Sequence, residues 1–148
     1  MDLKGYLPFE QILNDKIIAI YLSIKQNYKL GKNAECIEKI GKFVEAITRG
    51  LEFIFYGTPT PFEEEIKVYK VLEQLEQSPK DKYSDSERVL IPRALNLLYS
   101  FRNRRGGAHL KGISPLRIDA TLIVAACDWI IAELLRCHIK TDEKEVER

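Results

Sequence analysis

Residues 102–109, which read RNRRGGAH, combine side chains suited to acid–base chemistry with side chains that bind anions. The chain has only two histidines, and one of them, His109, closes this string. An imidazole has a pKa of about 6.5, which suits proton transfer near neutral pH, and neighbouring arginine charges should lower that pKa and favour the neutral base. A guanidinium binds phosphate oxygens through its charge and through paired hydrogen bonds. The string therefore predicts a site that acts on a phosphate-containing substrate.

The string lies in a segment of uneven charge. Between Arg88 and Ile118 there are seven basic residues and no acidic one, although the whole chain balances 23 Lys and Arg against 22 Asp and Glu. The seven are Arg88, Arg93, Arg102, Arg104, Arg105, Lys111 and Arg117. Such a local charge can hold the phosphates of a nucleic acid. The same pattern is compatible with a solvated face or with favourable charge at a helix C-terminus, and with a surface histidine after a glycine cap.

The string RNRRGGAH resembles the signature of the HEPN superfamily, an arginine, often a polar residue, and a histidine four to six residues further on. Arg102 fits with six intervening residues, and Asn103 fits the polar position. Arg104 also fits, with four intervening residues, so the register stays open although the asparagine favours Arg102. The run GGAHLKG before an apolar helix is also similar to C-terminal domains of abortive-infection proteins. The resemblance covers Ser84 to His138, while the first eighty residues are similar only in being helical.

Membership of that superfamily implies a compact helical bundle that cleaves RNA without a metal ion or another cofactor. Arg102, Asn103 and His109 would then be the catalytic residues. The histidine would activate the ribose 2′-hydroxyl or protonate the leaving oxygen, the arginine would stabilise charge on the phosphate, and the asparagine would orient one of these groups. A bend at Gly106 and Gly107 would bring His109 back towards Arg102. The products would include a 2′,3′-cyclic phosphate.

The resemblance also implies partners. Active members of the superfamily usually form homodimers in which two motifs face one cleft, so we expect Arg102 and His109 of both chains near a two-fold axis. RNA is the expected substrate, and an antitoxin or another defence protein is a further expected partner, because members occur in toxin–antitoxin and antiviral-defence systems. Four basic residues are predicted from charge alone to contact the RNA backbone: Arg93, Arg104, Arg105 and Lys111. Two alternatives stay open: a non-catalytic HEPN-like module that binds nucleic acid or a partner protein, and a purely structural interaction domain.

Other chemically capable residues have simpler explanations. Cys137 and His138 are more typical of a helix terminus than of a metal site, and no CxxC pair is present. The tyrosines Tyr69, Tyr83 and Tyr99 could stack on bases, but tyrosines at helical spacing usually lie in the core or at its rim. Two glutamates of the second predicted helix, Glu45 and Glu52, are expected to be solvated or paired with Lys42 and Arg49.

Apolar residues recur every three or four positions through most of the 148 residues, of which 45% are hydrophobic and 30% charged. This composition excludes a disordered or membrane-embedded chain, and the period predicts an all-α, single-domain antiparallel bundle of about five helices over residues 1–140, with a charged tail at 141–148. The expected helices run from just after Pro8 to about Leu30, from an Asn33 cap to Gly57, from a capping box at Thr60 to Ser78, from Ser84 to Gly106, and from Ser114 to about His138. Pro92 either kinks the fourth helix or begins a new one. The expected core of the last helix is Leu122, Ala125, Ala126, Trp129, Ile130 and Leu134.

Two glycines, Gly41 and Gly50, lie inside the second predicted helix, where each costs about 1 kcal/mol relative to alanine. They could allow a neighbouring helix to approach closely. The N-terminus lacks the apolar run of a signal peptide, and the longest apolar stretch, Leu122 to Cys127, is too short to span a bilayer. We therefore expect a cytoplasmic protein.

Overall fold

The computed structural model describes residues 7–105 and 115–138. The helices are α1 (Gln11–Lys29), α2 (Asn33–Tyr56), α3 (Val68–Glu76), α4 (Ile91–Arg105) and α5 (Arg117–His138), with a π-helical turn, η2 (Ser86–Leu90), directly before α4. No strand occurs within these two ranges. The predicted all-α bundle of about five helices in one domain is confirmed. No helix of the described ranges combines the length and the apolar character needed to cross a bilayer.

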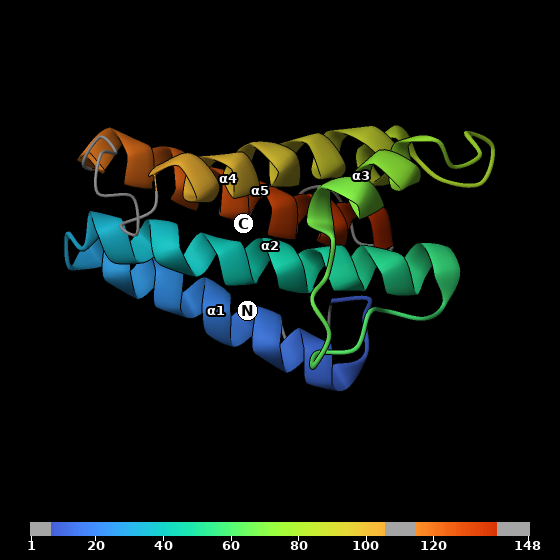
Figure 1. Ribbon diagram of the computed structural model, residues 1–148, viewed down its shortest axis with the longest axis horizontal. Helices are drawn as coiled ribbons and strands as arrows, with labels where there is room; N and C mark the ends of the chain where they lie inside the picture. The colour runs from blue at the N-terminus through green and yellow to red at the C-terminus, as the bar shows by residue number, and fades with distance from the viewer. Residues whose placement is uncertain (1–6, 106–114, 139–148) are drawn as a thin grey trace.

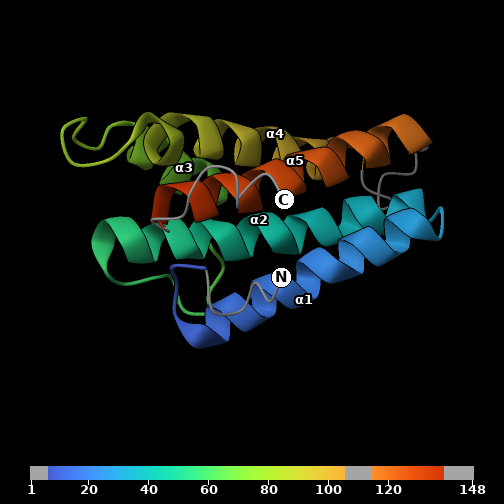
Figure 2. The ribbon, with the colours of Figure 1, turned by 180° about the vertical axis from the view of Figure 1, so that it is seen from behind.

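Helix α2 lies at the centre of the bundle. It contacts α1, α3, α4 and α5, with α1 on one side and the α4–α5 layer on the other (Figure 1 and, from behind, Figure 2). Its apolar stripe is fully buried at Ile37, Ile40, Phe43, Ile47 and Leu51. Each such side chain contributes about 1.5–3 kcal/mol by leaving water, so α2 is the main stabilising element of the fold.

The ends of α1 and α2 follow the glycine signals. Gly31 has φ of 72° and Gly57 has φ of 80°, a left-handed conformation that a residue with a Cβ adopts at a cost. The predicted N-cap at Asn33 is wrong, because Asn33 is the first residue of α2 and Lys32 precedes it without a side-chain cap. The two glycines, which adopt the left-handed conformation readily, therefore mark where α1 and α2 end.

The predicted start of the third helix at Thr60 is also wrong, since α3 begins at Val68. Glu52 of α2 accepts hydrogen bonds from the Thr60 amide and hydroxyl, both at 2.9 Å. The buried guanidinium of Arg49 donates to the carbonyl oxygens of Thr60 at 3.0 Å and Glu64 at 2.9 Å. These contacts use backbone groups that a helical turn would have used, so the tertiary contacts override the local capping signal.

Ser84 and Glu87 form a capping box, because the Ser84 hydroxyl donates to a Glu87 carboxylate oxygen at 2.9 Å and accepts from the Glu87 amide at 3.3 Å. Pro92 is the second residue of α4, as the alternative of a new helix predicts, but η2 continues into α4 without a non-helical residue between them. Because proline has no N–H, the carbonyl four residues before Pro92 lacks its α-helical hydrogen bond. The wider π turn of η2 lies at this missing bond.

Helix α5 buries a different face from the one expected. Ile130 and Leu134 are buried as predicted, but Leu122 is 42% exposed and Trp129 is 39% exposed. The buried residues are Ala120, Ile123, Cys127, Ile130, Ile131, Glu133, Leu134 and Leu135. The predicted cap at Ser114 lies outside the described residues, and the Leu116 amide instead donates to Asp119 at 2.8 Å. A helix that is apolar on most sides offers no period from which to choose its buried face.

A polar cluster joins the end of α5 to η2. His138 Nε2 lies 2.7 Å from Glu87 Oε2, and the buried Glu133 carboxylate contacts Ser86 and Arg136. Burial raises the pKa of Glu87, but its hydrogen bond with His138, the charge of His138 and the Ser84 hydrogen bonds outweigh burial and hold that pKa below the usual value. Burial likewise opposes the Arg136 and Ser86 contacts that lower the pKa of Glu133. The cluster therefore favours the ionised carboxylates in the folded protein.

Acidification is expected to destabilise this junction. A carboxyl group whose pKa is lowered on folding contributes stability above its ordinary pKa of about 4.5, and that contribution is lost as the pH falls through the lowered value. We expect the urea midpoint of the wild type to fall more steeply below pH 4.5 than that of Glu87→Gln. Equal pH dependence of the two proteins would contradict the assignment.

Candidate functional site

Arg102 lies in the last turn of α4 and packs across α2 at Gly41. A Cβ built on Gly41 would lie only 2.9 Å from Arg102 Nε, so the glycine is what allows the guanidinium to lie against α2. The group that comes close to Gly41 is therefore the side chain of Arg102, whereas the sequence suggested a neighbouring helix. Arg102 lines a hollow of about 340 Å³ together with Glu38, Lys39, Gly41, Lys42 and Glu45. This hollow is large enough to admit part of a ligand beside the guanidinium.

Asn103 is positioned to orient Arg102. Arg102 Nη1 donates to Asn103 Oδ1 at 3.1 Å, and Asn103 Nδ2 donates to the Tyr69 hydroxyl at 3.1 Å. Two of the three predicted catalytic residues are therefore brought together and held by a third residue from α3. His109 and Lys111 lie outside the described residues, so the approach of His109 to Arg102 stays a prediction.

The hydrogen bonds continue from Tyr69 along α4. The Tyr69 hydroxyl lies 3.1 Å from Ser100 Oγ, and Ser100 Oγ donates to Asn96 Oδ1 at 3.4 Å. Sequence reasoning missed Asn96 and Ser100 and placed Tyr69 in the core or at its rim. The available signal was a polar stripe along the fourth helix at spacings of three, four and three residues: Arg93, Asn96, Ser100 and Asn103.

A second tyrosine holds an acidic residue near Arg102. The Tyr99 hydroxyl donates to Glu45 Oε1 at 3.0 Å. Burial, followed by the charge of Glu45 and this hydrogen bond, raises the pKa of Tyr99 to about 12, so Tyr99 stays protonated and keeps donating. Glu45 is therefore neither merely solvated nor paired only with a lysine, as the sequence suggested.

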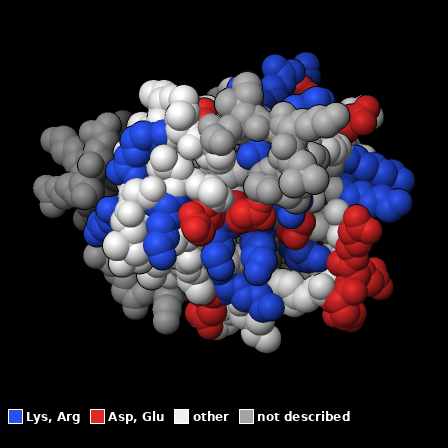
Figure 3. Space-filling model, turned by 60° about the vertical axis from the view of Figure 1, so that its left-hand side comes forward, with Lys and Arg blue, Asp and Glu red and all other residues white. Residues whose placement is uncertain are grey.

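The basic segment is free of acids in sequence but not in space. Arg93 pairs with Glu76 of α3, and Arg88 is buried and donates to the Glu76 carbonyl oxygen. Among the remaining arginines at the end of α4, Arg104 is exposed and Arg105 lies 5.4 Å from the centre of the Phe101 ring. Figure 3 looks towards the end of the bundle where α4 ends and α5 begins, and it shows groups of Lys and Arg with acidic side chains between them. Arg88 is thus structural, whereas Arg102, Arg104 and Arg105 gather at one end of α4.

An apolar stripe lies on the outer side of the neighbouring helix α5. Ile118 is 69% exposed, and together with Leu122 and Trp129 it follows a spacing of four and seven residues, with exposed Ala125 between them. Leu90 of η2 and Leu97 of α4 are each about half exposed, and both of these elements contact α5. We call Ile118, Leu122, Ala125 and Trp129 the α5 stripe. Exposed aliphatic and tryptophan side chains in one row are typical of a protein–protein interface.

The chain gave no match to a protein-family model, to a curated protein or to a solved structure. Within residues 7–105 and 115–138, no three His, Cys, Asp or Glu side chains are grouped as metal ligands. What the described site offers chemically is a guanidinium fixed by an amide, beside a hollow and a row of hydroxyl and amide groups. Such a set can bind a phosphate and the polar edges of an attached group.

Proposed function

We propose that this protein is a metal-independent endoribonuclease of the HEPN type that acts as a toxin or as an antiviral-defence component. The observation that carries the proposal is the Arg102–Asn103 pair at the end of α4, fixed at 3.1 Å, in the string that leads to His109. An oriented guanidinium at a helix end can stabilise the extra negative charge of a phosphate in the transition state. The helical bundle supports the same class but does not by itself distinguish among functions.

The reaction is an internal transfer at phosphorus. The ribose 2′-oxygen forms a bond to phosphorus while the bond to the 5′-oxygen of the next nucleotide breaks. His109 takes the proton of the 2′-hydroxyl or gives one to the leaving 5′-oxygen. The products are a 2′,3′-cyclic phosphate and a free 5′-hydroxyl, and no oxidant or other reactant is consumed. Arg104, Arg105 and Lys111 contribute charge along the RNA backbone, whereas Arg93 is already paired with Glu76.

The active form is a homodimer, and the second copy packs on the α5 stripe. Apolar side chains at Ile118 and Trp129 lie on the helix that follows the segment carrying His109, so a dimer formed there brings two such segments close to each other. In a two-fold interface the same surface of each copy packs against itself. An apolar row such as the α5 stripe can meet this requirement. An antitoxin or another defence protein is the partner expected to restrain the activity.

Cleavage of RNA in the presence of EDTA tests the proposal. Removing one donor that stabilises the transition state lowers the rate by about 10²–10³-fold, and removing a general acid or base has an effect of about 10²–10⁴-fold. We therefore expect Arg102→Ala and His109→Ala each to lose at least 100-fold in rate, with Arg102→Lys intermediate because lysine lacks the paired donors.

His138→Ala is the matched control for the histidine, because His138 binds Glu87 at the other end of α5. It should change stability and leave cleavage per folded molecule intact. Equal cleavage by wild type, Arg102→Ala and His109→Ala would remove the proposal.

A non-catalytic binding module is the second candidate, and the acidic neighbours of Arg102 favour it. Glu38 and Glu45 line the same hollow as Lys39, Lys42 and Arg102. The hollow therefore presents both signs of charge, which suits a complementary partner surface. For such a module, RNA binding would weaken with rising salt while the RNA stays uncut, and binding to a partner protein would be the alternative readout.

A further inference from the structure

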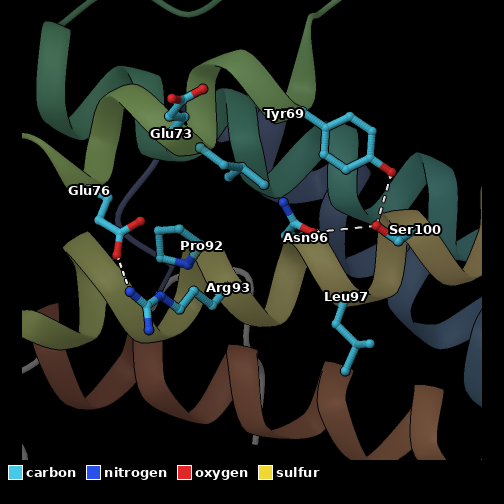
Figure 4. A pocket seen from close by; sticks show the side chains of 9 residues that line it. Tyr69, Glu73, Glu76, Pro92, Arg93, Asn96, Leu97 and Ser100 are labelled. Carbon is cyan, nitrogen blue, oxygen red and sulfur yellow. Dashed lines mark hydrogen bonds and ion pairs between the residues drawn. The ribbon is translucent and has the colours of Figure 1, made fainter.

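A groove lies between α3 and α4, separate from the hollow at Arg102. It has a volume of about 530 Å³, within the range of small-molecule sites. Its lining residues are Tyr69, Leu72, Glu73, Glu76, Pro92, Arg93, Asn96, Leu97 and Ser100. Figure 4 shows Tyr69 at one end of the groove and the Glu76–Arg93 ion pair at the other.

The groove combines apolar surfaces with one polar edge. Leu72 and Pro92 are buried beneath it, and the Tyr69 ring is 41% exposed at its end. Tyr69 is held in place, because its ring meets that of Tyr99 edge-on with centres 5.4 Å apart. Asn96 supplies the polar edge between these apolar surfaces (Figure 4). A flat ligand with apolar faces and a hydrogen-bonding rim fits such a lining.

The hydrogen-bond chain leaves donors directed to a ligand. Asn103 Nδ2 donates to the Tyr69 hydroxyl, and Ser100 Oγ donates to Asn96 Oδ1. When the Tyr69 hydroxyl donates to Ser100 Oγ, all three hydrogen bonds run in one direction, from Asn103 through Tyr69 and Ser100 to Asn96. In this arrangement the side-chain oxygen of Asn96 is engaged, and its amide N–H groups face the groove. An asparagine amide is a good partner for the edge of a nucleobase.

Charge argues for a base and against a phosphate in this groove. The one cation among its lining residues, Arg93, is already paired with Glu76. Glu73 is an exposed residue on the α3 side of the groove, and a carboxylate there opposes a phosphate. An uncharged, aromatic part of a nucleotide meets no such opposition, and stacking on a tyrosine favours it.

We infer that the α3–α4 groove binds one unpaired nucleobase of an RNA strand, which stacks on Tyr69 and is hydrogen-bonded by Asn96. This inference rests on the proposed ribonuclease function and names how its substrate is held. Asn96 and Arg102 are six residues apart, about 9 Å along α4 and about 120° around its axis, and we expect a base in the groove to belong to a nucleotide near the phosphate at Arg102. The Asn103–Tyr69 hydrogen bond connects the two positions directly.

Binding measured without cleavage tests the inference. The full chain carrying His109→Ala is titrated into a fluorescent single-stranded RNA in EDTA, alone and with Tyr69→Leu, Tyr69→Phe or Asn96→Leu. Loss of one stacked base is expected to weaken binding at least about fivefold for Tyr69→Leu, with an unchanged slope against salt, and Tyr69→Phe should keep most of the affinity. Tyr56→Leu is the matched control, because Tyr56 is an exposed tyrosine at the last residue of α2 and does not line the groove.

Adenosine and uridine 5′-monophosphates, with ribose 5-phosphate for comparison, separate base binding from phosphate binding. The side-chain amide signal of Asn96 should shift with the nucleotides and not with ribose 5-phosphate. Equal shifts with all three, or equal RNA affinity of Tyr69→Leu and Tyr56→Leu, would overturn the inference.

The outcome also separates this inference from the ribonuclease proposal. If Tyr69-dependent RNA binding persists but wild type does not cut, the groove stands and the nuclease fails. If wild type cuts RNA and Tyr69→Leu changes nothing, the groove fails alone. If wild type neither binds nor cuts RNA, both are wrong.

Discussion

Trp129→Glu is expected to convert the protein from a dimer to a monomer. Trp129 is 39% exposed on the α5 stripe, so a change there leaves most of the core intact. A tryptophan anchor in an interface contributes about 2–4 kcal/mol, which corresponds to a rise of about 30-fold to 1,000-fold in the dimer dissociation constant. The buried carboxylate adds a desolvation penalty and, across the two-fold axis, a repulsion between like charges.

Sedimentation equilibrium over a range of concentrations measures this effect, and RNA cleavage should fall in parallel with the dimer fraction. The unfolding midpoint should change little. Ile12→Glu is the matched control, because Ile12 is 66% exposed on α1 and lies outside the α5 stripe. A monomeric wild type, or a Trp129→Glu protein that still dimerises with full affinity, would show that the second copy does not bind on this face.

Gly41→Ala is expected to reduce cleavage without reducing stability. The added Cβ would lie 2.9 Å from Arg102 Nε, and the flexible arginine side chain can move to relieve that contact. Alanine is favoured over glycine inside a helix by about 1 kcal/mol, so the free energy of unfolding should stay constant or rise. Displacement of a catalytic group by about 1 Å can cost about 100-fold in rate, and we expect a loss of tenfold or more.

Gly50→Ala is expected to have the opposite effect to Gly41→Ala: it should lower stability and leave cleavage unchanged. A Cβ on Gly50 would lie 2.6 Å from the ring of Phe9, which is buried and cannot move aside without disturbing the core. Overpacking of this kind costs about 1–3 kcal/mol. Chemical denaturation should show Gly50→Ala as the less stable protein, while its cleavage per folded molecule remains near that of the wild type. Loss of stability in Gly41→Ala with normal cleavage would contradict the placement of Arg102 on α2.

The helices and most of their ends could be predicted because their signals are local. The stripe of α2, the left-handed glycine at Gly57 and the Ser84 capping box each depend on residues within a few positions. The start of α3 could not be predicted, since Arg49 and Glu52, more than a turn away in α2, hold the Thr60 segment in a non-helical path. The conformation of such a segment depends on contacts between elements, and the sequence alone does not show how those elements are arranged in space.

The candidate site divides in the same way. The adjacency of Arg102 and Asn103, and their place near the end of a helix, follow from the sequence alone, because neighbours in a helix stay within reach of each other. Only the tertiary structure places Tyr69 against Asn103, Glu45 beside Arg102, and the exposed face of α5 away from the core. The physical reason is range. Propensity, capping and glycine conformation act over about one helical turn, whereas Tyr69 and Asn103 are 34 positions apart and are brought together by the packing of α3 on α4.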